Sequence, residues 1–239
     1  MDRVFLTVAI LLATTSLAVP SASADMQATT YGFRRVTQNS NWDVANQLQM
    51  IVAETGRSDQ VSFIFRNIGS VSSSICDIHF EQRGADGDKT LSPLVGVASL
   101  WGTSGLVDFS VGTEPLGLAS GQKQAVQFLA TAKASADSSA PILSSGVNPG
   151  EWLSITFDLA AGSSYASVIE NLRNGLAGSS PSLRIGLHVQ AIGEDGRSDS
   201  YIDSYEAISY GIVLVPVPGA VMLAAMGLGL VALVQRRAA

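Results

Sequence analysis

The sequence predicts an all-β protein, a β-sandwich of jelly-roll or Ig-like topology that carries one short helix. Eight or nine short runs alternate apolar and polar residues, which is the pattern of strands with one buried face. Turn-forming Gly, Asp, Asn and Ser residues separate most of these runs. Long helical periodicities are rare, and no internal repeat has a fixed period. These patterns leave the jelly-roll and Ig-like arrangements as alternatives.

The first predicted strands lie between residues 48 and 132. Residues 48–54 and 60–67 predict a hairpin, because the residues between them are turn formers. In residues 74–82 the alternation places Cys76, Ile78 and Phe80 in the core. The polar residues between these three are expected on the opposite, solvated face: Asp77, His79 and Glu81. Further strands are predicted at residues 94–100, 106–111 and 124–132.

The second half of the chain holds the helix and the clearest strands. Residues 134–150 are rich in Ser, Pro and Gly and predict a long loop. Residues 164–176 have apolar positions at helical spacing, and residues 167–170 read as a capping box. Strands are predicted at residues 152–159, 183–191 and 200–209. In the last but one of these, His188 is expected on the polar face.

The charge and the cysteine count of the chain exclude some classes of function and of stabilisation. We call residues 25–214 the body; it carries 11 of the 14 basic residues and 19 of the 20 acidic ones, so its formal charge is −8. This charge argues against binding to nucleic acid, where clustered Lys and Arg supply most of the affinity. Cys76 is the single cysteine, so no intrachain disulfide forms. The core must therefore stabilise the fold by itself.

Two acidic turns are the candidate metal sites. Asp86 and Asp88, with Glu81, would place carboxylates in a Gly-rich turn, which suits calcium. The spacing lacks the pattern of a calcium-binding loop, and turns favour Asp and Gly in any case. A second acidic turn is weighed in the same way: Glu194, Asp195 and Asp199. The sequence therefore predicts no cofactor, with calcium at Asp86 and Asp88 as the alternative.

No residue set points to catalysis, and the chain is predicted not to be an enzyme. The sequence has no Gly-x-Ser-x-Gly elbow, and Cys76 alternates with core residues, so it reads as a small buried hydrophobe. The three tryptophans are candidates for stacking on sugar rings: Trp42, Trp101 and Trp152. Trp152 is the best of them, because alternation puts it on the non-core face. The alternative is a packing residue at a sheet edge.

Both ends of the chain carry targeting signals. Residues 4–18 are apolar, and Ala22 and Ala24 form an A-x-A cleavage site, so residues 1–24 predict a signal peptide. At the other end, the 23 residues from 212 to 234 carry no charge, which is enough to span a membrane as a helix. Arg236 and Arg237 follow this span and are expected to stay in the cytoplasm.

The C-terminal segment, residues 215–239, resembles the PEP-CTERM sorting domain, the tag that exosortases recognise in Gram-negative bacteria that make exopolysaccharide. The resemblance covers the apolar span, the arginine pair and the Pro-rich cue, which consists of Val215, Pro216, Val217, Pro218 and Gly219. Val217 replaces the usual acidic residue of the cue, as in the Val-Pro-Leu-Pro-Ala variant. The alternative is that this segment is a permanent membrane anchor, since any apolar run of this length can span a membrane.

The body resembles an ectodomain that recurs in front of such tags. The resemblance lies in residues 63–67, 74–80, 146–153 and 183–190, and that family has no activity to carry over. The chain is thus expected to be exported, held briefly in the inner membrane, cut by an exosortase and released to the cell surface or the exopolysaccharide matrix. A structural or adhesive role in biofilm is expected. The alternatives are a polysaccharide-binding module, with or without the assistance of calcium, and, ranked lowest, a secreted hydrolase.

Overall fold

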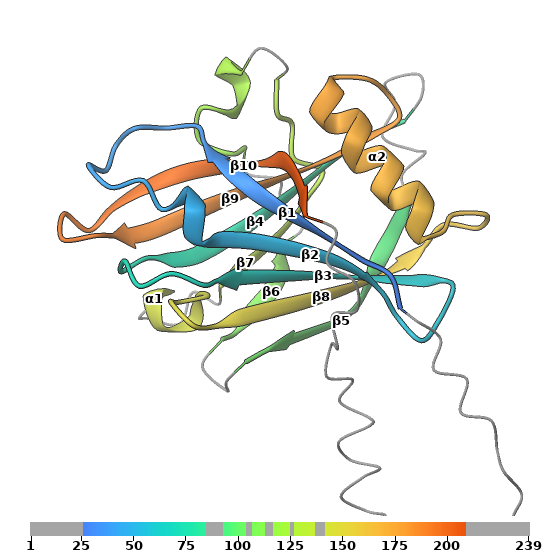
Figure 1. Ribbon diagram of the computed structural model, residues 1–239, viewed down its shortest axis with the longest axis horizontal. Coiled ribbons are helices and arrows are strands. Elements are labelled where there is room, and N and C mark those ends of the chain that lie inside the picture. Colours follow the sequence, from blue (N-terminus) through green and yellow to red (C-terminus); the bar gives the residue numbers. More distant parts are fainter. Residues whose placement is uncertain are drawn as a thin grey trace, which may run out of the picture.

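The computed structural model describes residues 26–84, 93–103, 107–112, 117–124, 127–136 and 142–208. Within these residues ten strands form one antiparallel sheet, in the order β5-β8-β3-β2-β1-β10-β9-β4-β7-β6 (Figure 1). The predicted all-β class is confirmed. The strands are β1 (Ala28–Arg35), β2 (Leu48–Glu54), β3 (Gln60–Asn67), β4 (Ser74–Arg83), β5 (Leu94–Gly102), β6 (Phe109–Gly112), β7 (Ala132–Ala136), β8 (Trp152–Leu159), β9 (Ser182–Ile192) and β10 (Arg197–Ile208).

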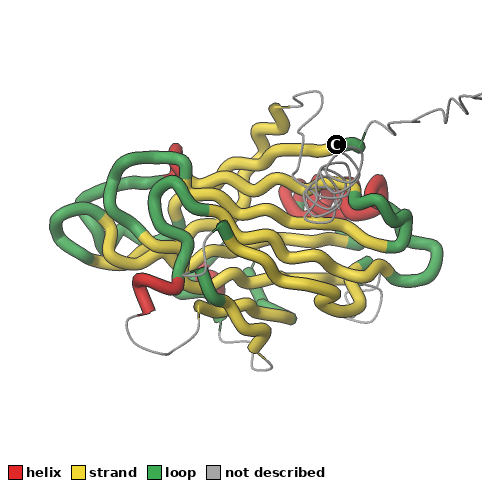
Figure 2. Tube along the Cα trace, turned by 90° about the horizontal axis from the view of Figure 1, so that it is seen from below, coloured by secondary structure: helices red, strands yellow, loops and turns green. Residues whose placement is uncertain are grey.

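Figure 2 shows the path of the strands along the sheet. Buried residues from both halves of the strand order form one core cluster, so the sheet curls around a shared core. Phe80 of β4 lies edge-on to Phe63 of β3 and Phe157 of β8, with ring centroids 5.7 and 4.9 Å apart. These strands are far apart in the strand order. Edge-to-face geometry suits aromatic rings, because the positive edge of one ring meets the negative face of another. The inward residues predicted for β8 are buried, and so are those predicted for β9 except Ala191, which is half-buried.

A helix, α2 (Tyr165–Ala177), packs at one end of the sheet (Figure 1). Its apolar face is buried, and Val168 and Leu172 have no exposed surface. Ser164 is the N-cap, and its side chain pairs reciprocally with Ser167. The predicted capping box at residues 167–170 was therefore placed three residues too late, because Ser167 can serve at the third helical position in place of Glu. Gly178 ends the helix in the left-handed conformation.

Two further parts of the prediction were wrong. Strand β1 was missed, because only Tyr31 and Phe33 of its side chains are fully buried and the rest of the run is mixed. The strand predicted at residues 124–132 is observed instead at Ala132–Ala136, which overlaps the start of the loop predicted at residues 134–150. The predicted loop also contains the short helix α1 (Ile142–Ser145). Strand β7 is built from Ala, Ser and Lys, so its alternation has little apolar contrast.

The outer face of β10, β9 and β4 is covered by residues 117–124 and 127–130, which we call the strap. Leu118, Phe128 and Ala130 of the strap pack on Ile202 of β10 and form a second, smaller core. A Cβ atom at Gly186 of β9 would lie 2.8 Å from Leu118 and 3.1 Å from Phe128. The strap can therefore approach the sheet closely only because residue 186 has no side chain.

The predicted targeting segments, residues 1–24 and 215–239, lie outside the described residues. In the part of the chain that the structure describes, no helix has the length and apolar character needed to span a membrane.

Candidate functional site

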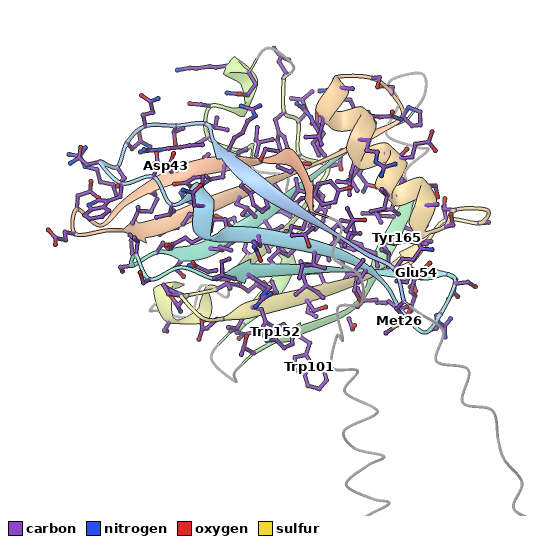
Figure 3. All side chains as sticks on the ribbon, in the orientation of Figure 1. Met26, Asp43, Glu54, Trp101, Trp152 and Tyr165 are labelled. Atoms are coloured by element: carbon purple, nitrogen blue, oxygen red, sulfur yellow. The ribbon has the colours of Figure 1, made fainter. Side chains whose placement is uncertain are left out.

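Two tryptophans lie next to each other on the outer face of β8 and β5 (Figure 3). Trp101 pairs with Ser154, which is two residues along β8 from Trp152, so the two indoles are diagonal neighbours on one face. Trp101 is 52 % exposed, and Trp152 is half-buried. On the adjacent strand β3, Arg66 pairs with Trp152. We call Trp101, Trp152, Ser154 and Arg66 the tryptophan face.

Polar side chains continue this face along the same strands. The hydroxyl groups of Ser62 and Thr156 are 2.8 Å apart, and the amide of Gln60 donates to Asp158 at 2.9 Å. Both pairs join β3 to β8 on the outer side of the sheet. This face thus carries indole rings at one end and two hydrogen-bonded polar pairs farther along the strands, with the buried side chain of Ile64 between them.

Trp152 is held in place through its backbone. Its N–H donates to the Thr103 hydroxyl at 2.6 Å, and its carbonyl accepts from the Thr103 N–H at 3.0 Å. These contacts tie the start of β8 to the end of β5. They fix the two tryptophans relative to each other, which is what a binding surface for a rigid ligand requires.

The sequence prediction for Trp152 agrees with its position outside the core. Trp101 and Arg66 were not singled out as its neighbours, because strand order is not visible in a local pattern. Trp42 lies elsewhere, against the turn between β9 and β10, where a Cβ atom at Gly193 would overlap its ring. Trp42 is therefore not part of the tryptophan face.

A second polar cluster lies on the outer face of β7, β4 and β9. Asp77 accepts from the Ser135 hydroxyl at 2.7 Å, lies 3.0 Å from His188 Nδ1 and 3.4 Å from Lys133 Nζ. Burial acts to raise the pKa of Asp77. The hydrogen bonds from His188 and Ser135 and the charge of Lys133 outweigh burial and lower this pKa well below its ordinary value.

This cluster contains the residue types of a catalytic triad in the wrong arrangement. In a triad, the serine bonds to the histidine, which takes its proton. Here the Ser135 hydroxyl donates to the Asp77 carboxylate, so the histidine is not its base. The Asp77 carboxylate instead links β4 to its two neighbouring strands, β7 and β9, and the positive charge of Lys133 balances its negative charge.

The prediction that His79 and Glu81 face solvent was wrong. Both side chains are buried, at 4 % and 1 % exposure, because the strap covers this face of β4. Glu81 is held by Arg83 and Arg184, and it accepts from the Leu129 N–H of the strap at 3.0 Å. A buried charge needs such partners to offset its desolvation.

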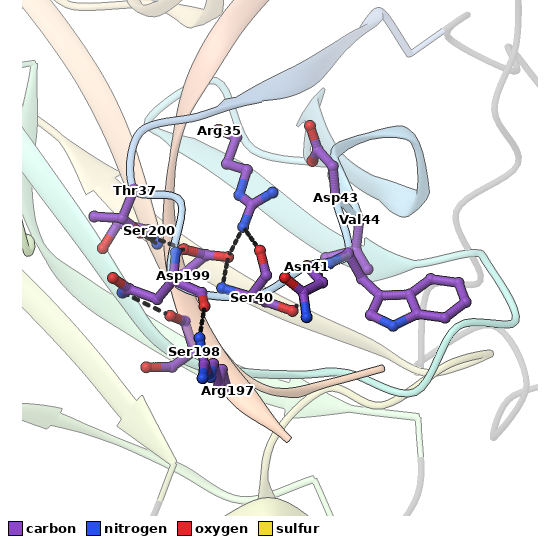
Figure 4. A network of polar contacts seen from close by, with 12 residues as sticks. Arg35, Thr37, Ser40, Asn41, Asp43, Val44, Arg197, Ser198, Asp199 and Ser200 are labelled. Atoms are coloured by element: carbon purple, nitrogen blue, oxygen red, sulfur yellow. Dashed lines mark hydrogen bonds and ion pairs between the residues drawn. The ribbon is translucent and has the colours of Figure 1, made fainter. Parts of the chain in front are cut away.

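The second acidic turn anchors a loop. Asp199 is fully buried, and its carboxylate accepts from the Thr37 hydroxyl and from the backbone N–H groups of Asn39 and Ser40 (Figure 4). Arg35 completes the shell as an ion-pair partner. Asp195 accepts from the N–H of Asn41, which lowers the pKa of Asp195. Because these oxygens already have donors, both carboxylates act as loop anchors here.

The remaining site predictions have separate outcomes. Cys76 is buried, and burial raises the pKa of its thiol to about 11, which keeps it protonated and unreactive. The candidate calcium ligands Asp86 and Asp88 lie outside the described residues. Among the residues that are described, no group of three or more His, Cys, Asp and Glu side chains is placed to hold a metal ion.

Comparison with known proteins identified no relative: no protein-family model, no curated protein and no solved structure matches this chain.

Proposed function

We propose that this chain is an exported surface or exopolysaccharide-matrix protein whose body binds polysaccharide through the tryptophan face. The observation that carries the proposal is the exposed pair Trp101 and Trp152 on adjacent strands, held by Thr103 and followed by a row of hydroxyl groups. Binding of this kind gives the structural or adhesive role in biofilm a physical basis.

The chemistry of the face suits sugars. The C–H face of a pyranose ring is apolar, and an indole offers a large rigid apolar surface at low conformational cost. The ring edge carries hydroxyl groups, which the polar side chains of β3 and β8 can satisfy. Trp101 and Trp152 lie on β5 and β8 at one edge of the sheet, where Trp101 is exposed and a polymer can reach it.

The destination is supported by the sequence alone. The signal peptide at residues 1–24 and the segment at residues 215–239 resemble the entry signal and sorting tag of an exosortase substrate. We propose three parts: signal peptide, body at residues 25–214, and sorting segment. The proposed partners are an exosortase, the inner membrane for a limited time, and extracellular polysaccharide. The contact of Phe63 with Phe80 supports describing the curled sheet as a sandwich.

The experiment is a binding titration of the full-length chain, purified in detergent, with polysaccharide from the host matrix. We expect Trp152→Ala to weaken binding about tenfold, because a stacked indole contributes on the order of 1 kcal/mol beyond its buried area. Affinity electrophoresis measures the change, and repeating it with a chelator tests the calcium-assisted alternative at Asp86 and Asp88.

Trp42→Ala is the matched control, since Trp42 is also partly exposed, at 44 %, but lies away from the face. If both variants bind as tightly as the wild-type chain, the tryptophan face is not the binding site.

A further inference from the structure

One cationic side chain lies within the tryptophan face. Arg66 pairs with Trp152 across β3 and β8, and with Gln49 across β2 and β3, so the three side chains form a row on one face. Residues paired in this way have Cβ atoms about 5 Å apart. Resting on the proposed function, we propose that this row selects polysaccharides that contain uronic acid, with Arg66 binding the sugar carboxylate.

Arg66 differs from half of the other ten basic residues of the body. Five of these residues form ion pairs with carboxylates: Arg35, Arg57, Arg83, Lys133 and Arg184. Arg66 is exposed, and within the described residues it has no ion pair with a carboxylate. A guanidinium group that is not already neutralised remains available to an anionic ligand.

The geometry of a uronate fits this row. A uronate carries its carboxylate on the edge of the pyranose ring, so a ring stacked on Trp152 would direct that edge toward the neighbouring strand. Arg66 occupies that position, and guanidinium groups bind carboxylates through two parallel hydrogen bonds. Gln49 is half-buried beyond Arg66 and can hydrogen-bond a ring hydroxyl. Stacking and charge would then act on the same sugar residue.

The net charge of the chain, −6, opposes a polyanion at long range. At physiological ionic strength, exposed charges are screened beyond about 8 Å. The acidic residue on the same face of β8, Asp158, is six residues from Trp152, or about 20 Å along an extended strand. Glu151 directly precedes Trp152, and its carboxylate accepts from the backbone N–H and the side-chain amide of Asn148, in the turn before β8. Arg66 supplies the positive charge on the face itself, and the general repulsion slows association without preventing binding.

The test compares two polymers that differ only in the carboxylate. The probes are polygalacturonate and the same polymer after its carboxyl groups are reduced to alcohols, both with a chelator present so that cations cannot bridge. We expect the wild-type, full-length chain to bind polygalacturonate about tenfold more tightly, the effect of one charge-assisted hydrogen-bonded pair. Arg66→Gln should remove this preference, so that the variant binds the two polymers with equal affinity.

Arg57→Gln is the matched control, because Arg57 is exposed but paired with Asp59 in the turn between β2 and β3. This variant should keep the preference. Equal binding of both polymers by the wild-type chain, an unchanged preference in Arg66→Gln, or binding to neither polymer overturns the uronate proposal. Trp152→Ala separates the two proposals: if it weakens binding to host matrix polysaccharide, the proposed function stands even when the uronate proposal fails.

Discussion

At the scale of single residues, the core contains a buried carboxyl group in which only one of the two oxygens has a described hydrogen-bond donor. Asp203 of β10 pairs with Phe33 and is 1 % exposed. Its Oδ1 accepts from the Ile185 N–H at 3.0 Å, whereas no described group donates to Oδ2. Burial raises the pKa of Asp203 to about 7, although the hydrogen bond from Ile185 acts in the opposite direction. The folded protein therefore favours the protonated form of Asp203 more strongly than the unfolded chain does.

This pKa predicts how stability depends on pH. In the unfolded chain the carboxyl group titrates near 3.8, so between about pH 4 and pH 7 the folded state holds a proton that the unfolded state has lost. Asp203 thus makes the free energy of unfolding fall as pH rises through this range, by up to about 1.4 kcal/mol per pH unit. Above pH 7 its contribution is constant. Asp203→Asn should remove this slope in urea unfolding measured from pH 4 to 8.

Asp59→Asn is the control for that measurement, because Asp59 is exposed in a turn. The hydrogen bond from Arg57 is the main cause that lowers the pKa of Asp59 below its ordinary value. Its replacement should leave the slope between pH 4 and 7 as in the wild-type chain. A slope that persists in Asp203→Asn would show that Asp203 is ionised in the folded protein.

At the scale of elements, the contact between the strap and β9 depends on Gly186. A valine there would press against Leu118 and Phe128, which a Cβ atom alone would already approach to 2.8 and 3.1 Å. We expect Gly186→Val to lower the free energy of unfolding by about 1–3 kcal/mol, the usual cost of overpacking a well-packed contact. Urea unfolding of the full-length chain measures the loss.

Gly96→Val is the matched control, since a Cβ atom at Gly96 of β5 meets nothing within 4 Å. Both variants place the same β-branched residue in a strand, so the added side chain is the same and only its surroundings differ. Equal stability of the two variants would mean that the strap does not pack closely on β9.

Also at the scale of elements, the sequence predicts strands well where one face meets the core and the other meets solvent. Strands β2, β3 and β8 were predicted at their observed bounds. Strand β8 alternates throughout, whereas β2 and β3 were recognised from apolar runs next to turn formers and also bury Ile51 and Ile64 on the outer face.

In β4 the alternation was read correctly for Ile78 and Phe80, but the polar face is buried as well. The strap that covers this polar face comes from a distant part of the chain. It supplies the Leu129 N–H that donates to Glu81, and no pattern in the sequence around Glu81 predicts this contact.

At the scale of the whole molecule, the tryptophan face is a product of strand order. Trp152 was expected outside the core from β8 alone. Its neighbours Trp101 and Arg66 come from β5 and β3, which flank β8 although they are separated from it by about 50 and 86 residues in sequence. A period-2 pattern reports which face a residue occupies, whereas the partner strand depends on the whole core. This is why, of the row formed by Gln49, Arg66 and Trp152, the sequence alone predicted only Trp152 as a site residue.

The order of the parts along the chain makes the proposed processing compatible with an intact fold. Strand β10 ends at Ile208, and the Pro-rich cue begins at Val215. A cut between Val215 and Gly219 would therefore separate the apolar span and Arg236 from the protein while leaving every described strand on the released part. The released body should bind polysaccharide as the full-length chain does, because the tryptophan face lies entirely upstream of the cut.

The mass of the protein in its host tests this processing. In a host with its exosortase, we expect intact-mass spectrometry of the secreted protein to show a chain that lacks residues 1–24 and ends near the cue. After deletion of the exosortase, the protein should remain in the membrane fraction and keep Arg236 and Arg237, because nothing then removes the apolar span. Replacing Pro216 and Pro218 by alanine should have the same effect, since proline disfavours helix and we propose that the exosortase recognises an extended cue. A wild-type protein that retains both arginines would identify the segment as a permanent anchor and refute its role as a sorting tag.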